Sequence, residues 1–119
     1  MPKSLPMMQI NQDQLSFLVA VLLVYRKYRR EKTPPTEERM HTLIVLDLLI
    51  SRLNGGLATS REPASLLLTE DDIHVLKAGL IMLLDRLNRK PPTAAIKQET
   101  QRLKELKTLI DQTFQITQD

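Results

Sequence analysis

Two acidic–histidine pairs have a spacing that could bind a metal ion. Glu38 precedes His41 by three residues, and Asp71 precedes His74 by the same interval. On a helix this interval places both side chains on one face, and two such pairs supply half of a di-metal site in some helical bundles. Both pairs fall in the first turns of consecutive predicted helices, where acidic residues are expected from the helix dipole. Consecutive helices should be antiparallel, which would place the pairs at opposite ends. We therefore predict no metal site.

Residues for nucleophilic or acid–base catalysis are not brought together by the sequence pattern. The chain has no cysteine and two histidines, which fall on different predicted helices. A nucleophile needs a base within hydrogen-bonding reach. Asp47 is the one charge in the apolar stretch 43–50, either in a cleft or at the rim of a buried face. We favour the rim because buried unpaired charges are rare. We expect neither enzymatic activity nor a cofactor, and no small-molecule ligand.

Basic residues are concentrated where the first predicted helix ends. Cations at a helix C-terminus interact favourably with the helix dipole. In an up-down-up-down bundle the first and third helices are parallel, so their basic C-terminal residues would lie at one end of the molecule. We therefore predict a single basic pole. The candidates for contacting an anionic partner are Arg26, Lys27, Arg29, Arg30, Arg86, Arg89 and Lys90.

The predicted basic pole is compatible with more than one partner. Lysine and arginine can neutralise nucleic acid phosphates, but a net charge of +3 does not by itself indicate nucleic acid binding. The chain has no zinc-finger pattern, and aromatic residues that could stack on bases make up 3% of the sequence. A membrane surface is disfavoured because the first helix is apolar on more than one face, unlike an interfacial helix. Nucleic acid remains a possible partner, after protein.

Composition and local signals predict which elements carry these residues. The 119 residues suit one domain, and 42% hydrophobic residues with few aromatics and three glycines favour helices over strands. Asn11 with Gln14, and Thr69 with Asp72, are spaced to cap helix N-termini. Repeated Pro-Pro-Thr sequences and Asn54-Gly55-Gly56 should interrupt helices.

These signals predict four helices, over residues 11–32, 36–54, 69–90 and 93–115. The expected fold is all-α, a single-domain antiparallel (up-down-up-down) four-helix bundle spanning 11–115. We predict a flexible N-terminal arm over 1–10, a C-terminal tail over 116–119, a long loop over 57–68 and no strand. Gly79 lies within the third predicted helix, where glycine is unfavourable. We expect a neighbouring helix to approach closely there.

The first predicted helix has apolar residues on two faces. A helix that is apolar nearly all round is normally buried nearly all round. It is therefore either the central helix of the bundle or a helix that faces a second subunit. We favour a homodimer, with Phe17, Val21 and Val24 as candidate self-association residues.

The most apolar run, 15–25, does not predict a membrane span or a signal peptide. Its eleven residues are fewer than the roughly 20 that a spanning helix needs. Asp13 precedes it, and basic residues follow where a signal peptide would have small ones. We therefore expect a soluble, cytoplasmic protein. The favoured function is a non-enzymatic interaction module that acts as an adaptor, regulator or assembly factor. The alternative is a nucleic-acid-associated regulator.

Overall fold

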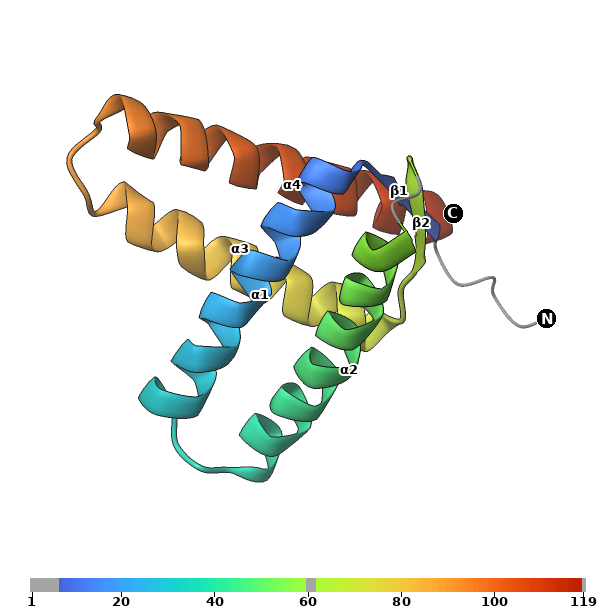
Figure 1. Ribbon diagram of the computed structural model, residues 1–119. Coiled ribbons are helices and arrows are strands. Elements are labelled where there is room, and N and C mark those ends of the chain that lie inside the picture. The colour runs from blue at the N-terminus through green and yellow to red at the C-terminus, as the bar shows by residue number, and fades with distance from the viewer. Residues whose placement is uncertain (1–6, 60–61, 119) are drawn as a thin grey trace.

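The computed structural model of the protein describes residues 7–59 and 62–118, with side chains as far as 113. Figure 1 shows four helices and a small two-stranded sheet. The all-α, four-helix prediction is confirmed. The elements in chain order are β1 Met7–Ile10, α1 Gln12–Lys32, α2 Glu37–Thr59, β2 Ala64–Leu67, α3 Glu70–Asn88 and α4 Ala94–Gln118.

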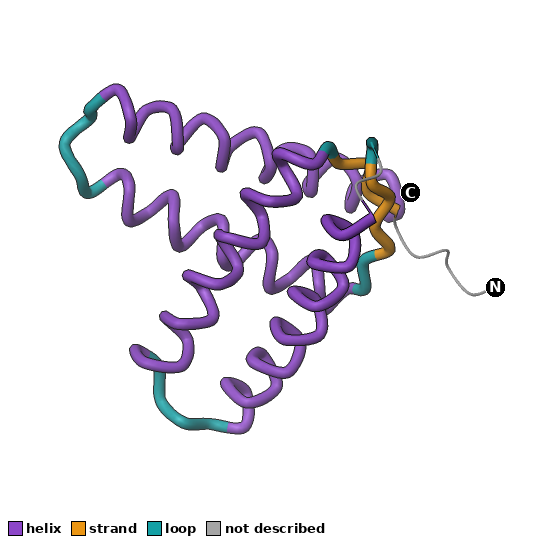
Figure 2. The backbone as a smooth tube through the Cα atoms, in the orientation of Figure 1, coloured by secondary structure: helices purple, strands orange, loops and turns teal. Residues whose placement is uncertain are grey.

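The helices form two antiparallel hairpins that lie across each other. Helix α1 packs against α2, and α3 packs against α4, while α1 and α2 both contact α3. The tube in Figure 2 shows that the two hairpins cross and that their turns point in different directions. The up-down-up-down bundle is therefore not the arrangement seen. Local signals such as proline turns specify hairpins, but they do not specify the angle at which one hairpin packs on another.

The predicted helix starts at α1 and α3 are confirmed, including their caps. Asn11 Oδ1 accepts a hydrogen bond of 2.7 Å from the backbone amide of Gln14, whose side chain accepts from the Asn11 amide at 3.1 Å. At α3 the Thr69 hydroxyl accepts from the Asp72 amide at 3.1 Å, and the Asp72 carboxylate accepts from the Thr69 amide at 2.9 Å. Both reciprocal pairs satisfy amides that the first turn of a helix leaves without partners.

Helix α2 does not end at Asn54 as predicted, but continues through both glycines to Thr59. Neither glycine has a positive φ, so neither forms the left-handed cap that usually ends a helix. Gly56 instead allows close packing, because an ideal Cβ there would lie 3.2 Å from Leu15 Cδ2. Gly56 therefore belongs to a contact between α2 and α1.

The two strands correct three expectations about irregular structure. β1 and β2 pair antiparallel, with Met7 opposite Leu67 and Ile10 opposite Ala64. Met8 and Ile10 are 0% and 1% exposed. Residues 7–10 are thus not a flexible arm, the segment 57–68 is not one loop, and a sheet is present. Residues 1–6 lie outside the described residues. Strands of four residues carry too short an alternation to recognise, and their pairing joins distant parts of the chain.

The core is aliphatic and lies where the two hairpins cross. Gly79 of α3 sits against Tyr25 of α1, which confirms the predicted close approach at this glycine. The largest fully buried side chains come from β1, from the residue that follows β2 and from all four helices. They are Met8, Ile10, Leu15, Leu18, Leu22, Leu46, Leu49, Leu53, Leu68, Leu76, Leu80 and Leu103.

Candidate interaction surfaces

The basic residues near the end of α1 are partly engaged within the chain. Arg26 Nε lies 2.5 Å from Asp47 Oδ1 on α2. The Asp47 side chain is 55% exposed, so the rim position predicted for it is confirmed. Arg29 is 18% exposed and lies 3.9 Å from Glu38, whereas Lys27 and Arg30 are exposed. Of the candidates on this helix, Lys27 and Arg30 are the most accessible to a partner.

The turn between α1 and α2 is stabilised by Arg39, which lies in the first turn of α2. Arg39 Nη1 donates hydrogen bonds of 3.0 and 3.1 Å to the carbonyl oxygens of Arg30 and Thr33. These carbonyls are at the C-terminus of α1, where helical partners are missing. The Thr33 hydroxyl donates to the Arg29 carbonyl in the same turn. Arg39 therefore caps α1 from the following helix.

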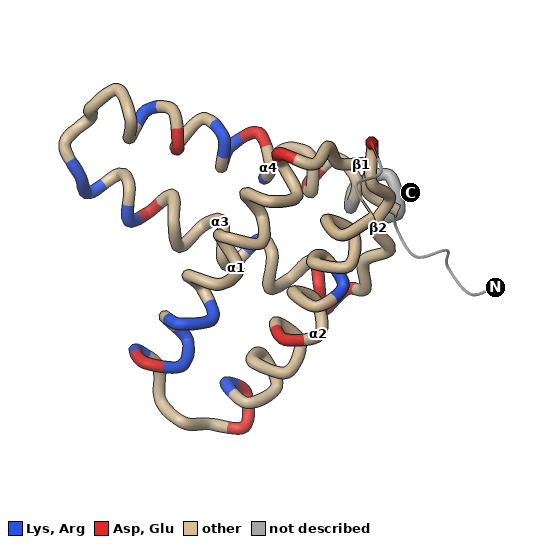
Figure 3. Tube along the Cα trace, in the orientation of Figure 1, with Lys and Arg blue, Asp and Glu red and all other residues tan. Residues whose placement is uncertain are grey.

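The second basic group lies near the end of α3. The Arg86 guanidinium is 5.5 Å from the centre of the Tyr28 ring, a cation–π contact between α3 and α1. Arg89 pairs with Asp85 at 2.9 Å, and Lys90 is exposed. Figure 3 shows the basic residues at the ends of two diverging hairpins. The predicted single pole is therefore replaced by two basic tips, because the hairpins cross instead of lying side by side. The α1–α2 tip has Arg26, Lys27, Arg29 and Arg30, and the α3–α4 tip has Arg86, Arg89 and Lys90.

A shallow pocket lies at the tip of the α3–α4 hairpin. It has a volume of about 450 Å³, and Lys90, Lys97 and Lys104 line it. No acidic residue is among the residues that line this pocket. The α1–α2 tip differs, because Glu31, Glu37 and other acidic residues lie beside its cations. The charged side chains that line the pocket at the α3–α4 tip are thus all lysines, although Asp85 pairs with Arg89 near the same tip.

The candidate self-association residues on α1 lie mostly inside the chain. Val21 is 3% exposed. Phe17 is half-buried, with the guanidinium of Arg102 from α4 4.1 Å from the centre of its ring. Val24 is 40% exposed. The rest of the chain therefore covers the second apolar face of α1 at Phe17 and Val21. This favours the other interpretation of the apolar pattern, in which α1 is a central helix and does not face a second subunit.

Helix α2 carries the exposed apolar surface instead. Met40, Ile44 and Leu48 follow one another at intervals of four, so they form one row along the helix, and their exposed fractions are 65%, 53% and 63%. Leu23 of α1 is 52% exposed. The sequence contained a signal for this exposed surface. Residues 43–50 are all apolar except Asp47, and a helix with one buried face needs fewer apolar residues than that.

Among the described helices, α2 is also the one long and apolar enough to cross a membrane. The core helix of a protein in water meets the same criteria of length and composition when it is mostly buried. In α2, 28% of the apolar stretch is buried. The finding reinforces the conclusion that α2 presents apolar side chains that the rest of the chain leaves uncovered.

A second pocket adjoins the C-terminal half of α2. Its volume is about 560 Å³, and its walls come from α2 and from the two-stranded sheet. Leu49, Leu53 and Gly55 contribute from the helix, and Met7 and Leu67 from the strands. Met7 and Leu67 are about half exposed, at 54% and 51%. One helix thus carries a projecting apolar row in its first half and borders an apolar hollow in its second.

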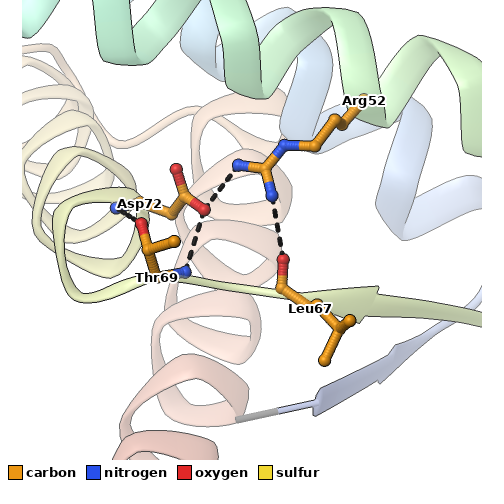
Figure 4. Close-up of polar contacts among 4 residues, drawn as sticks. All are labelled: Arg52, Leu67, Thr69 and Asp72. Atoms are coloured by element: carbon orange, nitrogen blue, oxygen red, sulfur yellow. Dashed lines mark hydrogen bonds and ion pairs between the residues drawn. The ribbon is translucent and has the colours of Figure 1, made fainter. Parts of the chain in front are cut away.

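The edge of this pocket is held by an ion pair that joins three elements (Figure 4). Arg52 Nη2 of α2 lies 2.5 Å from Asp72 Oδ2 of α3, and Nη1 donates to the Leu67 carbonyl of β2 at 3.1 Å. The Asp72 side chain is 5% exposed. A buried carboxylate is tolerated when charged and hydrogen-bonding groups compensate it. Arg52 and the Thr69 amide supply that compensation, so Asp72 is a structural residue.

The two acidic–histidine pairs are closer together than predicted. His41 Nε2 lies 3.5 Å from Asp71 Oδ2, because the crossing of the hairpins brings the start of α3 against α2. The expectation that the pairs lie at opposite ends was therefore wrong. Within residues 7–59 and 62–118, no group of three or more acidic, histidine or cysteine residues is placed to hold a metal ion.

Two ionisable groups have shifted pKa values. Burial raises the pKa of Tyr25, and the nearby Arg29 partly offsets that effect. Burial opposes ionisation of Asp111, but the ammonium groups of Lys77 and Lys107, at 2.7 and 3.0 Å, outweigh it and lower the pKa of this carboxyl. The Asp111 cluster fastens α4 to α3, and neither group lies in a pocket described above.

No protein-family model, characterised protein or solved structure is detectably similar to this chain.

Proposed function

We propose that the protein is a non-enzymatic helical interaction module, an adaptor, regulator or assembly factor, which associates with a second copy of itself. The observation that carries the proposal is the exposed row of Met40, Ile44 and Leu48. Exposed apolar patches rimmed by polar residues mark interaction sites. Covering the remaining surface of these side chains would contribute on the order of 1 kcal/mol for each of them.

The proposal differs from the sequence-based one in its surface. Self-association through Phe17 and Val21 would need α1 to leave its own core, because Val21 is 3% exposed. The row on α2 requires no such rearrangement. Its three side chains already project from one face of a helix whose other side packs against α1 and α3.

Sedimentation of the wild-type protein over a range of concentrations tests the proposal. We expect a dimer that dissociates on dilution, and Ile44→Lys should shift the protein to monomer. Ile81→Lys is the matched control, because Ile81 of α3 has the same side chain and nearly the same exposure, 52% against 53%. A wild-type protein that is monomeric at high micromolar concentration would contradict self-association, and equal effects of both substitutions would contradict the choice of surface.

A second proposal, from a different class, is a nucleic-acid-associated regulator. The lysine-lined pocket at the α3–α4 tip supports it, because no carboxylate among the lining residues opposes an anion there. Such contacts act through phosphate neutralisation and weaken steeply with salt. Replacing Lys90 and Lys97 should therefore weaken binding to a labelled nucleic acid more than replacing Lys27 and Arg30 at the α1–α2 tip.

A further inference from the structure

The two halves of α2 are complementary in shape. In the N-terminal half, Met40, Ile44 and Leu48 project from the surface, each more than half exposed. In the C-terminal half, Gly55 has no side chain, and the helix borders the pocket of about 560 Å³. A second copy whose α2 ran antiparallel would bring its projecting row to this hollow, and its own hollow to the first copy's row.

Gly55 is the glycine that the folded chain does not explain. At Gly79 and Gly56 an added Cβ would meet Tyr25 and Leu15, whereas at Gly55 it would meet nothing within 4 Å. Gly55 has no positive φ either. Glycine inside a helix costs about 1 kcal/mol relative to alanine. Close approach of another backbone or a large side chain would use the missing side chain, and within residues 7–59 and 62–118 neither comes within 4 Å of the position of an added Cβ at Gly55.

The direction of the pairing follows from the helix dipoles. Two α2 helices that lie side by side have opposed dipoles when they run antiparallel and aligned dipoles when they run parallel, so the antiparallel arrangement is favoured.

We propose that two copies of the chain dock through α2, antiparallel about a two-fold axis near Leu48, so that Met40 of each copy enters the pocket beside Gly55 of the other. This inference rests on the proposed self-association. Met40 and Gly55 are separated by about 22 Å along the helix. An axis midway between them brings both copies of Leu48 together and keeps the two copies of Met40 far apart. The interface is isologous, as two-fold symmetry requires.

Single cysteines test this geometry cleanly because the chain has none of its own. A disulfide forms where the two Cα atoms lie within about 7 Å. Under mild oxidation, Leu48→Cys should give a disulfide-linked dimer in high yield. Met40→Cys and Gly55→Cys should each cross-link poorly alone, and a mixture of the two, one carrying a size tag, should give the mixed dimer. Ile81→Cys on α3 reports the background from random collisions.

Filling the hollow gives an independent measurement. Gly55→Leu adds a side chain where the folded chain has open space, so the monomer should keep its helical circular dichroism and at least its thermal stability. The dissociation constant of the dimer should rise by tenfold or more. Loss of dimer without loss of fold separates an interface role from a structural one.

The outcomes separate this inference from the proposal beneath it. A wild-type dimer in which Leu48→Cys cross-links no better than Ile81→Cys, or in which Met40→Cys links to itself, would overturn the antiparallel geometry and leave self-association standing. An unchanged dissociation constant for Gly55→Leu would also overturn it. A monomeric wild type would overturn both, and if that monomer bound lipid vesicles, a membrane would be the occupant of the row.

Discussion

Gly79 of α3 lies against the ring of Tyr25 of α1, so closely that an ideal Cβ on the glycine would be 3.4 Å from both Cβ and Cγ of the tyrosine. This distance is ordinary van der Waals contact, with no space for more than a methyl group. It fixes the separation of the two helices where the hairpins cross. The Tyr25 ring stacks beside the ring of Tyr28, and the Arg86 guanidinium of α3 lies over the Tyr28 ring. The contact between α1 and α3 therefore continues from Gly79 towards the C-termini of both helices.

Substitutions at Gly79 should therefore have opposite signs according to size. Gly79→Ala should be neutral or stabilising by up to about 1 kcal/mol, because alanine is the better helix former and its methyl group fits. Gly79→Leu should destabilise by about 1–3 kcal/mol, since the larger side chain must push α1 and α3 apart. Urea unfolding followed by circular dichroism measures both. Equal stability of the two variants would contradict the close packing at this site.

Val21 and Val24 give a matched test of which face of α1 is inside. Val21→Glu places a carboxylate at a position that is 3% exposed and should destabilise by several kcal/mol or prevent folding. Val24→Glu, at a position that is 40% exposed, should change stability by less than about 1 kcal/mol. Thermal unfolding of the two variants checks the difference. A folded, monomeric Val21→Glu protein would instead restore the α1 face as the dimer contact.

The ion-pair cluster around Asp111 predicts a pH dependence. Its pKa is lowered in the folded protein, so its contribution to stability is present above its unfolded value of about 3.9 and is lost as the pH falls through the folded value. The contribution should be below about 1 kcal/mol, because partly exposed ion pairs are weak. Asp111→Asn should be less stable than wild type at neutral pH, and the difference should vanish in acid. A difference that is unchanged in acid would mean that the charge of Asp111 is not responsible.

Local features of the fold were predictable from the sequence, and the packing of its hairpins was not. The caps at Asn11 and Thr69 and the proline turns depend on residues a few positions apart, and the structure has both. The pairing of β1 with β2 joins residues far apart in the chain, as does the crossing that splits the basic pole. The sequence also shows that residues 43–50 have more apolar side chains than one buried helix face needs. Which helix keeps its surplus of apolar residues exposed was not predictable, because that depends on how α1, α2 and α3 pack against one another.

The two basic tips allow the nucleic acid proposal to be tested with two variants that have the same net charge as each other. Lys90→Ser with Lys97→Ser removes two cations from the lysine-lined pocket, and Lys27→Ser with Arg30→Ser removes two from the α1–α2 tip. All four positions are exposed, so each variant should lose less than about 0.5 kcal/mol of stability per substitution. Fluorescence anisotropy with a labelled duplex or single strand, at several salt concentrations, gives affinity and salt dependence together.

If the protein is a nucleic-acid-associated regulator, the loss of affinity should be confined to the Lys90 and Lys97 variant. The slope of log affinity against log salt should also become shallower for that variant, by about 0.9 for each lysine that contacts a duplex phosphate. Equal losses in both variants would show attraction by net charge alone, without a site. No binding by the wild type near physiological salt would remove the nucleic acid proposal and leave the apolar row of α2 as the surface through which the protein acts.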